Sequence, residues 1–176
     1  MRDEYGIPDH LFGSIDADLP AFVGRIVMVS ALIEHQVAAM VAWFQDLESN
    51  HYFAQDPARN FDVCRQRFRY FPAGAHTGQI ALGRKYLSQA KRLLGERNEV
   101  VYRVWSVASG DVWGGHKGMR RQGKGRRAAE KGWDYPPARL KAILAEMVTV
   151  CDFERRSALP LVLALPRLPT PWADGI

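Results

Sequence analysis

The sequence predicts an all-α protein, a four-helix bundle whose helices are joined by short connections. Apolar residues recur every three or four positions in four separate segments, as they do on the buried face of a helix. Clusters of Pro, Gly, Asn and Ser separate these segments. A chain of 176 residues, 47% hydrophobic and 24% charged, is long and apolar enough for one domain with a core of its own.

The first helix is expected over residues 19–48. Asp16 and Asp18 are typical of a helix start, and Pro20 suits the first turn. The apolar positions then follow at steps of three or four residues: Phe22, Ile26, Val29, Ile33, Val37, Met40 and Phe44. Ser49-Asn50-His51 is interpreted as a break after this helix.

Two further helices are expected over residues 59–71 and 77–107. The first of them ends at Pro72-Ala73-Gly74. Its apolar face consists of Phe61, Cys64, Phe68 and Phe71. The apolar face of the next helix consists of Ile80, Leu87, Leu94 and Val101, seven residues apart, with Ala90 and Trp105 on the same stripe.

A small hairpin and a glycine-rich insert are expected before the last helix. Ser109-Gly110-Asp111 is a turn signal between residues 104–107 and 112–113. Six glycines lie within 19 residues from Gly114 to Gly132, which predicts a long flexible loop.

The insert, residues 109–133, carries most of the net charge. From His116 to Trp133 the chain has seven basic residues and one acid, a net +6 where the whole chain has +5. Such charge suits a phosphate backbone, and flanking tryptophans can stack on bases. The alternatives are an acidic protein partner and a solvated loop. The residues expected to bind nucleic acid are Lys117, Arg120, Arg121, Lys124, Arg126 and Arg127.

The last helix is expected from Asp134 to about residue 159, with Tyr135-Pro136-Pro137 at its start. Its apolar face consists of Leu140, Ile143, Leu144, Met147, Val150 and Cys151. Proline-rich residues 166–176 form a tail. Residues 1–165 are therefore expected to form a single domain.

Polar residues interrupt the apolar stripe late in the third helix. Arg97 lies three residues after Leu94 and four before Val101, so helical geometry places it on the stripe. Asn98 lies beside it, and Tyr102 lies one turn after Asn98. Such residues must be paired, or must line a cleft or a subunit interface, unless Arg97 reaches water at the helix edge.

The segment Arg97–Trp105 resembles the Arg-Asn-x-x-x-His segment of HEPN-domain proteins, which in several bacterial families is followed by a small residue and a Trp. The order of elements is similar too. A long first helix carries Glu34 among apolar residues, and the motif lies late in a later helix. A Gly- and Arg-rich hairpin insert follows, and then a helix that opens with Tyr135-Pro136-Pro137. The resemblance spans residues 20–160.

The resemblance implies a HEPN-like four-helix bundle that forms a homodimer, with two motifs meeting in a cleft across the two-fold axis. Many members are metal-independent endoribonucleases of toxin–antitoxin, phage-defence or CRISPR systems. Their arginine stabilises charge on the phosphate and their histidine acts as acid or base. In this chain Arg97 and Asn98 match the motif, and Tyr102 stands at the histidine position. Glu34 is the acid best placed to pair with Arg97, if the first and third helices are neighbours.

Tyrosine at the histidine position changes the expected chemistry. About one tyrosine in a thousand is ionised at pH 7, so using it as a base costs about 4 kcal/mol, although it can still donate a proton. Three hypotheses follow. The first is an endoribonuclease that uses Arg97, Asn98 and Tyr102. The second is an inactive HEPN-like domain that binds RNA, an antitoxin or another acidic partner through its insert. The third is a small structural helical protein.

Other patterns narrow the function classes. Two cysteines are too few for a disulfide scaffold or a four-thiolate zinc site, and Cys151 is expected to be a buried thiol. His35 and His76 are interpreted as structural or exposed, so no metal is expected. No cofactor is expected either, since the dinucleotide and phosphate-loop motifs are absent. Without an 18-residue apolar run or a signal peptide, we expect a cytoplasmic protein with no membrane partner.

Overall fold

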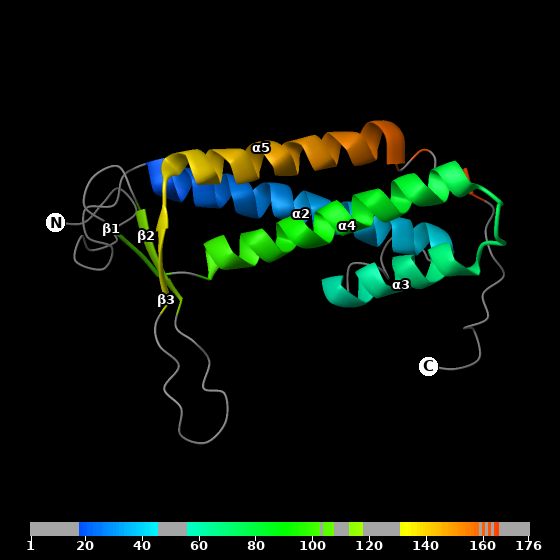
Figure 1. The fold of residues 1–176 in the computed structure, drawn as a ribbon, viewed down its shortest axis with the longest axis horizontal. Helices are drawn as coiled ribbons and strands as arrows, with labels where there is room; N and C mark the ends of the chain where they lie inside the picture. The colour runs from blue at the N-terminus through cyan, green and yellow to red at the C-terminus, as the bar shows by residue number, and fades with distance from the viewer. Residues whose placement is uncertain are drawn as a thin grey trace, which may run out of the picture. The chain divides into compact units, whose positions relative to one another are not determined.

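The computed structural model describes residues 18–45, 56–102, 104–107, 113–117 and 131–158, together with residues 160, 162, 164 and 165. Four α-helices dominate these residues, so the predicted all-α class is confirmed, although the chain also forms a small three-stranded sheet (Figure 1). The chain divides into two compact units, which are described separately. They are unit 1 (Met1–Met28 and Gly95–Ala145) and unit 2 (Val29–Leu94 and Glu146–Ile176).

The helices agree in number and order with the sequence prediction. They are α2 (Asp18–Gln45), α3 (Pro57–Tyr70), α4 (Thr77–Val101) and α5 (Pro137–Phe153). The helices expected over residues 19–48 and 59–71 are confirmed to within a few residues, although residues 46–48 lie outside the described part. Capping explains where α3 begins: Pro57 is its first residue, and the Asp56 carboxylate accepts a hydrogen bond from the Ala58 N–H at 2.9 Å.

The end of α4 differs from the prediction. The helix stops at Val101, and the prediction that it continues to residue 107 is wrong, because Val104–Val107 form strand β1. Valine and tryptophan favour the extended conformation. The Trp105 indole N–H donates to the Val100 carbonyl at 3.1 Å, which satisfies one of the carbonyls left open where the helix ends.

The predicted hairpin is confirmed and extended by a third strand. β1 pairs antiparallel with β2 (Trp113–Lys117), and β2 pairs antiparallel with β3 (Lys131–Tyr135). Val107 lies opposite Trp113, and the turn predicted at Ser109-Gly110-Asp111 lies outside the described residues.

Part of the predicted flexible loop is therefore sheet. β2 and β3 lie inside the insert, so the prediction of a loop throughout residues 114–132 is wrong. Backbone pairing uses groups that glycine also carries, so a glycine-rich segment can still form a strand. Residues 118–130 lie outside the described part.

The last helix, α5, begins and ends at other residues than the sequence predicted. Asp134 and Tyr135 belong to β3, so the helix begins at Pro137 instead of Asp134. After Phe153 the chain continues in the π-helical turn η1 (Glu154–Ala158). Two prolines in succession stop the strand and place a proline in the first turn of α5, where its missing N–H costs nothing.

Among the described residues, most of the buried apolar side chains belong to unit 2, and its four helical segments contribute to them. The Phe44 and Phe68 rings meet edge to face, with centroids 5.3 Å apart. The core residues of unit 2 include Ile33, Val37, Met40, Phe61, Cys64, Tyr86, Leu87, Leu93, Met147 and Val150. Those of unit 1 include Leu19, Ile26, Val100, Leu140 and Ile143.

A buried chain of hydrogen bonds joins α2, α4 and α5 within unit 2. The hydroxyl of Tyr86, which is fully buried, donates to the Gln36 side-chain oxygen at 3.1 Å. The Gln36 side-chain nitrogen donates to the Cys151 carbonyl at 3.2 Å. Because a buried polar group without a partner costs about 1–3 kcal/mol, these bonds oppose any sliding of the three segments.

By length and composition alone, α2 is the one described helix that could cross a membrane. Its most apolar 18-residue window has a mean hydropathy of 1.6, and 44% of that window is buried inside the structure. A core helix of a soluble protein meets the same criterion, so this finding does not identify a spanning segment.

The close packing of α3 on α4 in unit 2 is tested at Gly83. A Cβ atom at this position would overlap Cζ of the buried Phe68 ring, so we expect Gly83→Ala to destabilise the protein by about 1–3 kcal/mol. Gly95→Ala on the same helix meets no atom within 4 Å and should stabilise by about 0.5–1 kcal/mol. Urea unfolding measures both. Equal effects from the two variants would contradict the packing described.

Candidate functional site

The three motif residues lie at the end of α4 in unit 1. Arg97 is half-buried, with its Nε atom inaccessible to solvent, whereas Asn98 is exposed. The side chain of Tyr102 is 65% exposed. The Tyr102 backbone N–H donates to the Asn98 carbonyl at 3.2 Å, so the prediction that these residues lie one turn apart is confirmed. This end of the helix therefore offers an amide and a phenol to solvent beside a half-buried guanidinium.

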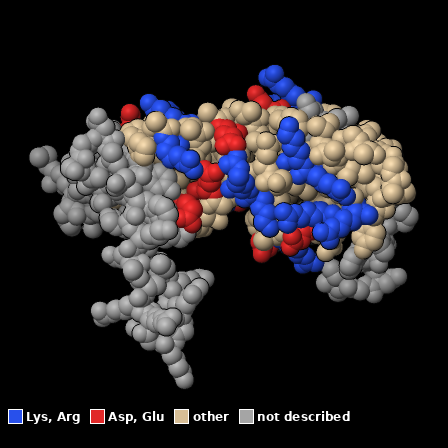
Figure 2. Space-filling model, viewed as in Figure 1, with Lys and Arg blue, Asp and Glu red and all other residues tan. Residues whose placement is uncertain are grey.

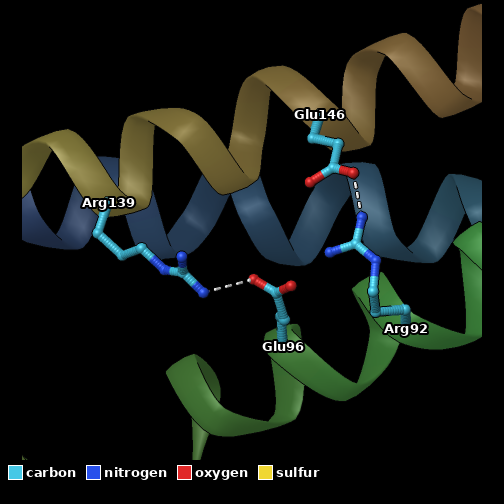
Figure 3. A network of polar contacts seen from close by, with 4 residues as sticks. All are labelled: Arg92, Glu96, Arg139 and Glu146. Atoms are coloured by element: carbon cyan, nitrogen blue, oxygen red, sulfur yellow. Dashed lines mark hydrogen bonds and ion pairs between the residues drawn. The ribbon is translucent and has the colours of Figure 1, made fainter.

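An ion pair holds the beginning of α5 against this part of α4. The Arg139 guanidinium donates to the Glu96 carboxylate at 3.2 Å, and Glu96 is the residue immediately before Arg97 (Figure 3). In unit 2 a second ion pair, Arg92 with Glu146, joins the same two helices (Figure 3). Arg139 is more than half exposed, so its pair contributes up to about 1 kcal/mol.

Glu34, the fourth candidate, lies on a different helix from the three motif residues. It is half-buried on α2 and belongs to unit 2, whereas Arg97 belongs to unit 1. The expected pairing of Glu34 with Arg97 stays a prediction.

The residues expected to bind nucleic acid lie mostly outside the described part. The backbone of Lys117 forms the end of β2. The others are outside the described ranges: Arg120, Arg121, Lys124, Arg126 and Arg127. Their contact with nucleic acid stays a prediction.

A second basic segment escaped the sequence analysis. Between Pro57 and Leu94 the chain has eight Lys or Arg residues and one acid, Asp62, a net charge of +7. The net charge summed over all residues outside the insert does not reveal this positive excess, because acidic residues in other segments cancel it. Seven of the eight cations are exposed on α3 and α4 in unit 2, and we call them the α3–α4 basic surface: Arg59, Arg65, Arg69, Arg84, Lys85, Lys91 and Arg92.

Unit 2 also buries titratable groups that the sequence analysis did not identify. Burial raises the pKa of the Glu154 carboxyl to about 7, and this side chain is 1% exposed. Burial, and then the nearby Glu154 carboxylate, raise the pKa of the Tyr86 hydroxyl. Burial likewise raises the pKa of the Cys64 thiol, and that of the Cys151 thiol to about 11. Both cysteines are therefore protonated at neutral pH, and the expectation of a buried thiol at Cys151 is confirmed.

Within the described ranges, no three His, Cys, Asp or Glu side chains come together as a metal ion would require. The candidate site at the end of α4 consists of cationic, amide and phenolic groups, which bind an anion better than a cation.

No family model, curated protein or solved structure matches this chain. The resemblance to HEPN-domain proteins that the sequence suggests stays a prediction.

Glu154 makes the stability of unit 2 depend on pH. In the unfolded chain its carboxyl ionises near the ordinary value of 4.5, whereas in the folded chain it stays protonated up to about pH 7. The unfolded state therefore binds fewer protons between these values, and the carboxyl lowers stability as the pH rises from 4.5 to 7.

Glu154→Gln removes this loss. We expect the variant to gain stability over the wild type as the pH rises, reaching on the order of 3 kcal/mol above pH 7. Urea unfolding at pH 5, 6, 7 and 8 measures the difference, and Asp152→Asn controls for the loss of a carboxylate at an exposed position. A difference that is constant from pH 5 to 8 would contradict the burial of an ionisable carboxyl.

Proposed function

We propose that this protein is a metal-independent endoribonuclease of the HEPN kind that acts at the end of α4. One observation carries this proposal: Asn98 and Tyr102 are exposed one helical turn apart, beside the half-buried Arg97. If Arg97, Asn98 and Tyr102 only packed against the core, their polar groups would be buried or would lie apart from one another.

Each of the three residues has a role that its chemistry suits. A half-buried guanidinium is permanently charged and forms two hydrogen bonds to a phosphate, and it is more effective where water is partly excluded. Arg97 then stabilises the negative charge that develops on the phosphoryl oxygens in the transition state. Asn98 orients the phosphate or the ribose through its amide, and Tyr102 supplies an O–H donor.

The reaction follows from the groups available. The ribose 2′-oxygen attacks the adjacent phosphorus, and the bond from phosphorus to the 5′-oxygen breaks. The 2′-hydroxyl proton passes to water, and Tyr102 donates a proton to the departing 5′-oxygen and regains one from solvent. The products are a 2′,3′-cyclic phosphate and a 5′-hydroxyl. DNA lacks the 2′-hydroxyl and is not cleaved.

A two-fold arrangement of two chains completes such a site, because it brings two copies of Arg97 to one phosphate. The exposure of Asn98 and Tyr102 leaves this face of α4 accessible to a second copy. A homodimer is therefore part of the proposal.

A second candidate function is RNA binding without cleavage. It is favoured by Tyr102 itself, because a tyrosine at its ordinary pKa is a poor base at neutral pH. In that case the wild-type protein binds RNA and leaves it intact.

Substitutions at the end of α4 test the ribonuclease. In EDTA, we expect purified protein to cleave mixed cellular RNA, and Arg97→Ala to slow cleavage by about 100-fold or more, through lost charge stabilisation. Tyr102→Phe removes only the hydroxyl and should slow cleavage by about 100-fold.

Arg25→Ala is the matched control, since it removes an exposed arginine of unit 1 on α2, outside the motif, and should leave the rate within about twofold. Gel electrophoresis of the RNA over time measures all four proteins. Equal rates for Arg97→Ala and the wild type would contradict the proposed site.

A further inference from the structure

The α3–α4 basic surface gathers seven exposed cations on two helical segments of unit 2. Figure 2 shows Lys and Arg side chains gathered over α3 and the neighbouring part of α4. The contributing segment, residues 57–94, has a net charge of +7, one unit more than the +6 of His116–Trp133 in the insert. Beneath it, Arg67 on α3 is 3% exposed, so a further positive charge is held just under the surface. Repulsion among these cations lowers stability, and a bound polyanion relieves it.

Three of the seven cations are not used by the described part of the fold. Of the others, Arg92 pairs with Glu146, Arg65 with Asp62, Lys85 lies over the Phe153 ring, and Arg84 donates to the Phe68 carbonyl. Within the described ranges, Arg59, Arg69 and Lys91 form no ion pair, although all three are exposed. These three cations are therefore available to a ligand without first breaking an interaction.

The surface also presents an aromatic ring and a hollow. Tyr70, next to Arg69 at the end of α3, is 55% exposed. Beside it, the turn from α3 to α4 forms a shallow pocket whose charged lining residues are Arg69 and Arg84. The Arg84 guanidinium is held in place by donating to the Phe68 carbonyl at 2.9 Å.

We infer that the α3–α4 basic surface binds single-stranded RNA through its phosphate backbone, with Tyr70 stacking on a base. Cations alone would suit an acidic polypeptide equally well. An exposed tyrosine that directly follows an exposed arginine favours a nucleic acid, because such rings stack on bases while guanidinium groups hold the phosphates. Single-stranded RNA fits best, since its bases are free to stack on a side chain.

This inference adds a substrate-holding surface to the proposed ribonuclease, and it also stands if the protein binds RNA without cleaving it. Binding is therefore measured with a 2′-O-methyl RNA oligonucleotide, which has no free 2′-hydroxyl and cannot be cleaved by the proposed reaction. A protein that binds this probe but cleaves no RNA disproves the ribonuclease alone.

The experiment compares two double variants with equal changes of net charge. Arg59→Glu with Arg69→Glu reverses two cations of the surface. Arg25→Glu with Arg155→Glu reverses two exposed cations outside it, on α2 and η1. Fluorescence anisotropy gives the Kd of the labelled oligonucleotide for each protein from 0.05 to 0.3 M salt, in EDTA.

If each reversed cation loses one phosphate contact, counterion release predicts about 25-fold weaker binding of the surface variant at 0.1 M salt. The slope of log K against log salt becomes shallower by about 1.4. The control variant should bind within about threefold of the wild type. Equal losses in the two variants, or no loss in the surface variant, would overturn the inference.

Tyr70 and the nature of the polyanion are tested separately. Tyr70→Ala should weaken binding by about tenfold, and Tyr70→Phe, which keeps the ring, should not. Labelled polyglutamate of the same length is the second probe. Binding of polyglutamate as tight as that of the RNA probe, with the same loss in the surface variant, would overturn RNA as the ligand and assign the surface to an acidic protein.

Discussion

The packing of unit 2 depends on one buried side chain, that of Gln36 on α2. Its amide accepts a hydrogen bond from Tyr86 on α4 and donates one to the Cys151 carbonyl on α5. Apolar side chains alone tolerate repacking, but these bonds have one geometry, and a helix that slid by a residue would leave buried polar groups without partners. Gln36 therefore fixes both the position of each helical segment and its rotation about its own axis.

That rotation determines what the helices show to solvent. With Tyr86 turned inward, the cations Arg84 and Lys91 on α4 are exposed. Asn98 follows Lys91 by seven residues on the same uninterrupted helix, and it is exposed as well. The hydrogen bonds of Gln36 in the core thus explain why Arg84, Lys91 and Asn98 of α4 lie at the surface.

The apolar stripes predicted the helices because each stripe recurs over several turns, as from Phe22 to Phe44 in α2. The end of α4 was missed because Trp105 continues its helical spacing while favouring a strand. The start of α5 was missed because Asp134–Pro137 was interpreted as the start of a helix, although Tyr135 favours a strand. The burial of Gln36 and Glu154 could not be predicted, since a single polar residue in a helix gives the same sequence pattern whether it is buried or exposed. The spacing of Asn98 and Tyr102 was predictable from helix geometry, and the basic surface on α3 and α4 was readable only once the charge was summed over residues 57–94.

The chemistry proposed for the end of α4 leaves a distinct mark on its products. Purified wild-type protein is incubated with a single-stranded RNA oligonucleotide in EDTA, and the masses of the fragments are measured by mass spectrometry. Attack by the 2′-hydroxyl predicts fragments that end in a 2′,3′-cyclic phosphate, paired with fragments that begin with a 5′-hydroxyl. Intact RNA in the presence of folded protein, or fragments that end in a 3′-hydroxyl, would contradict it.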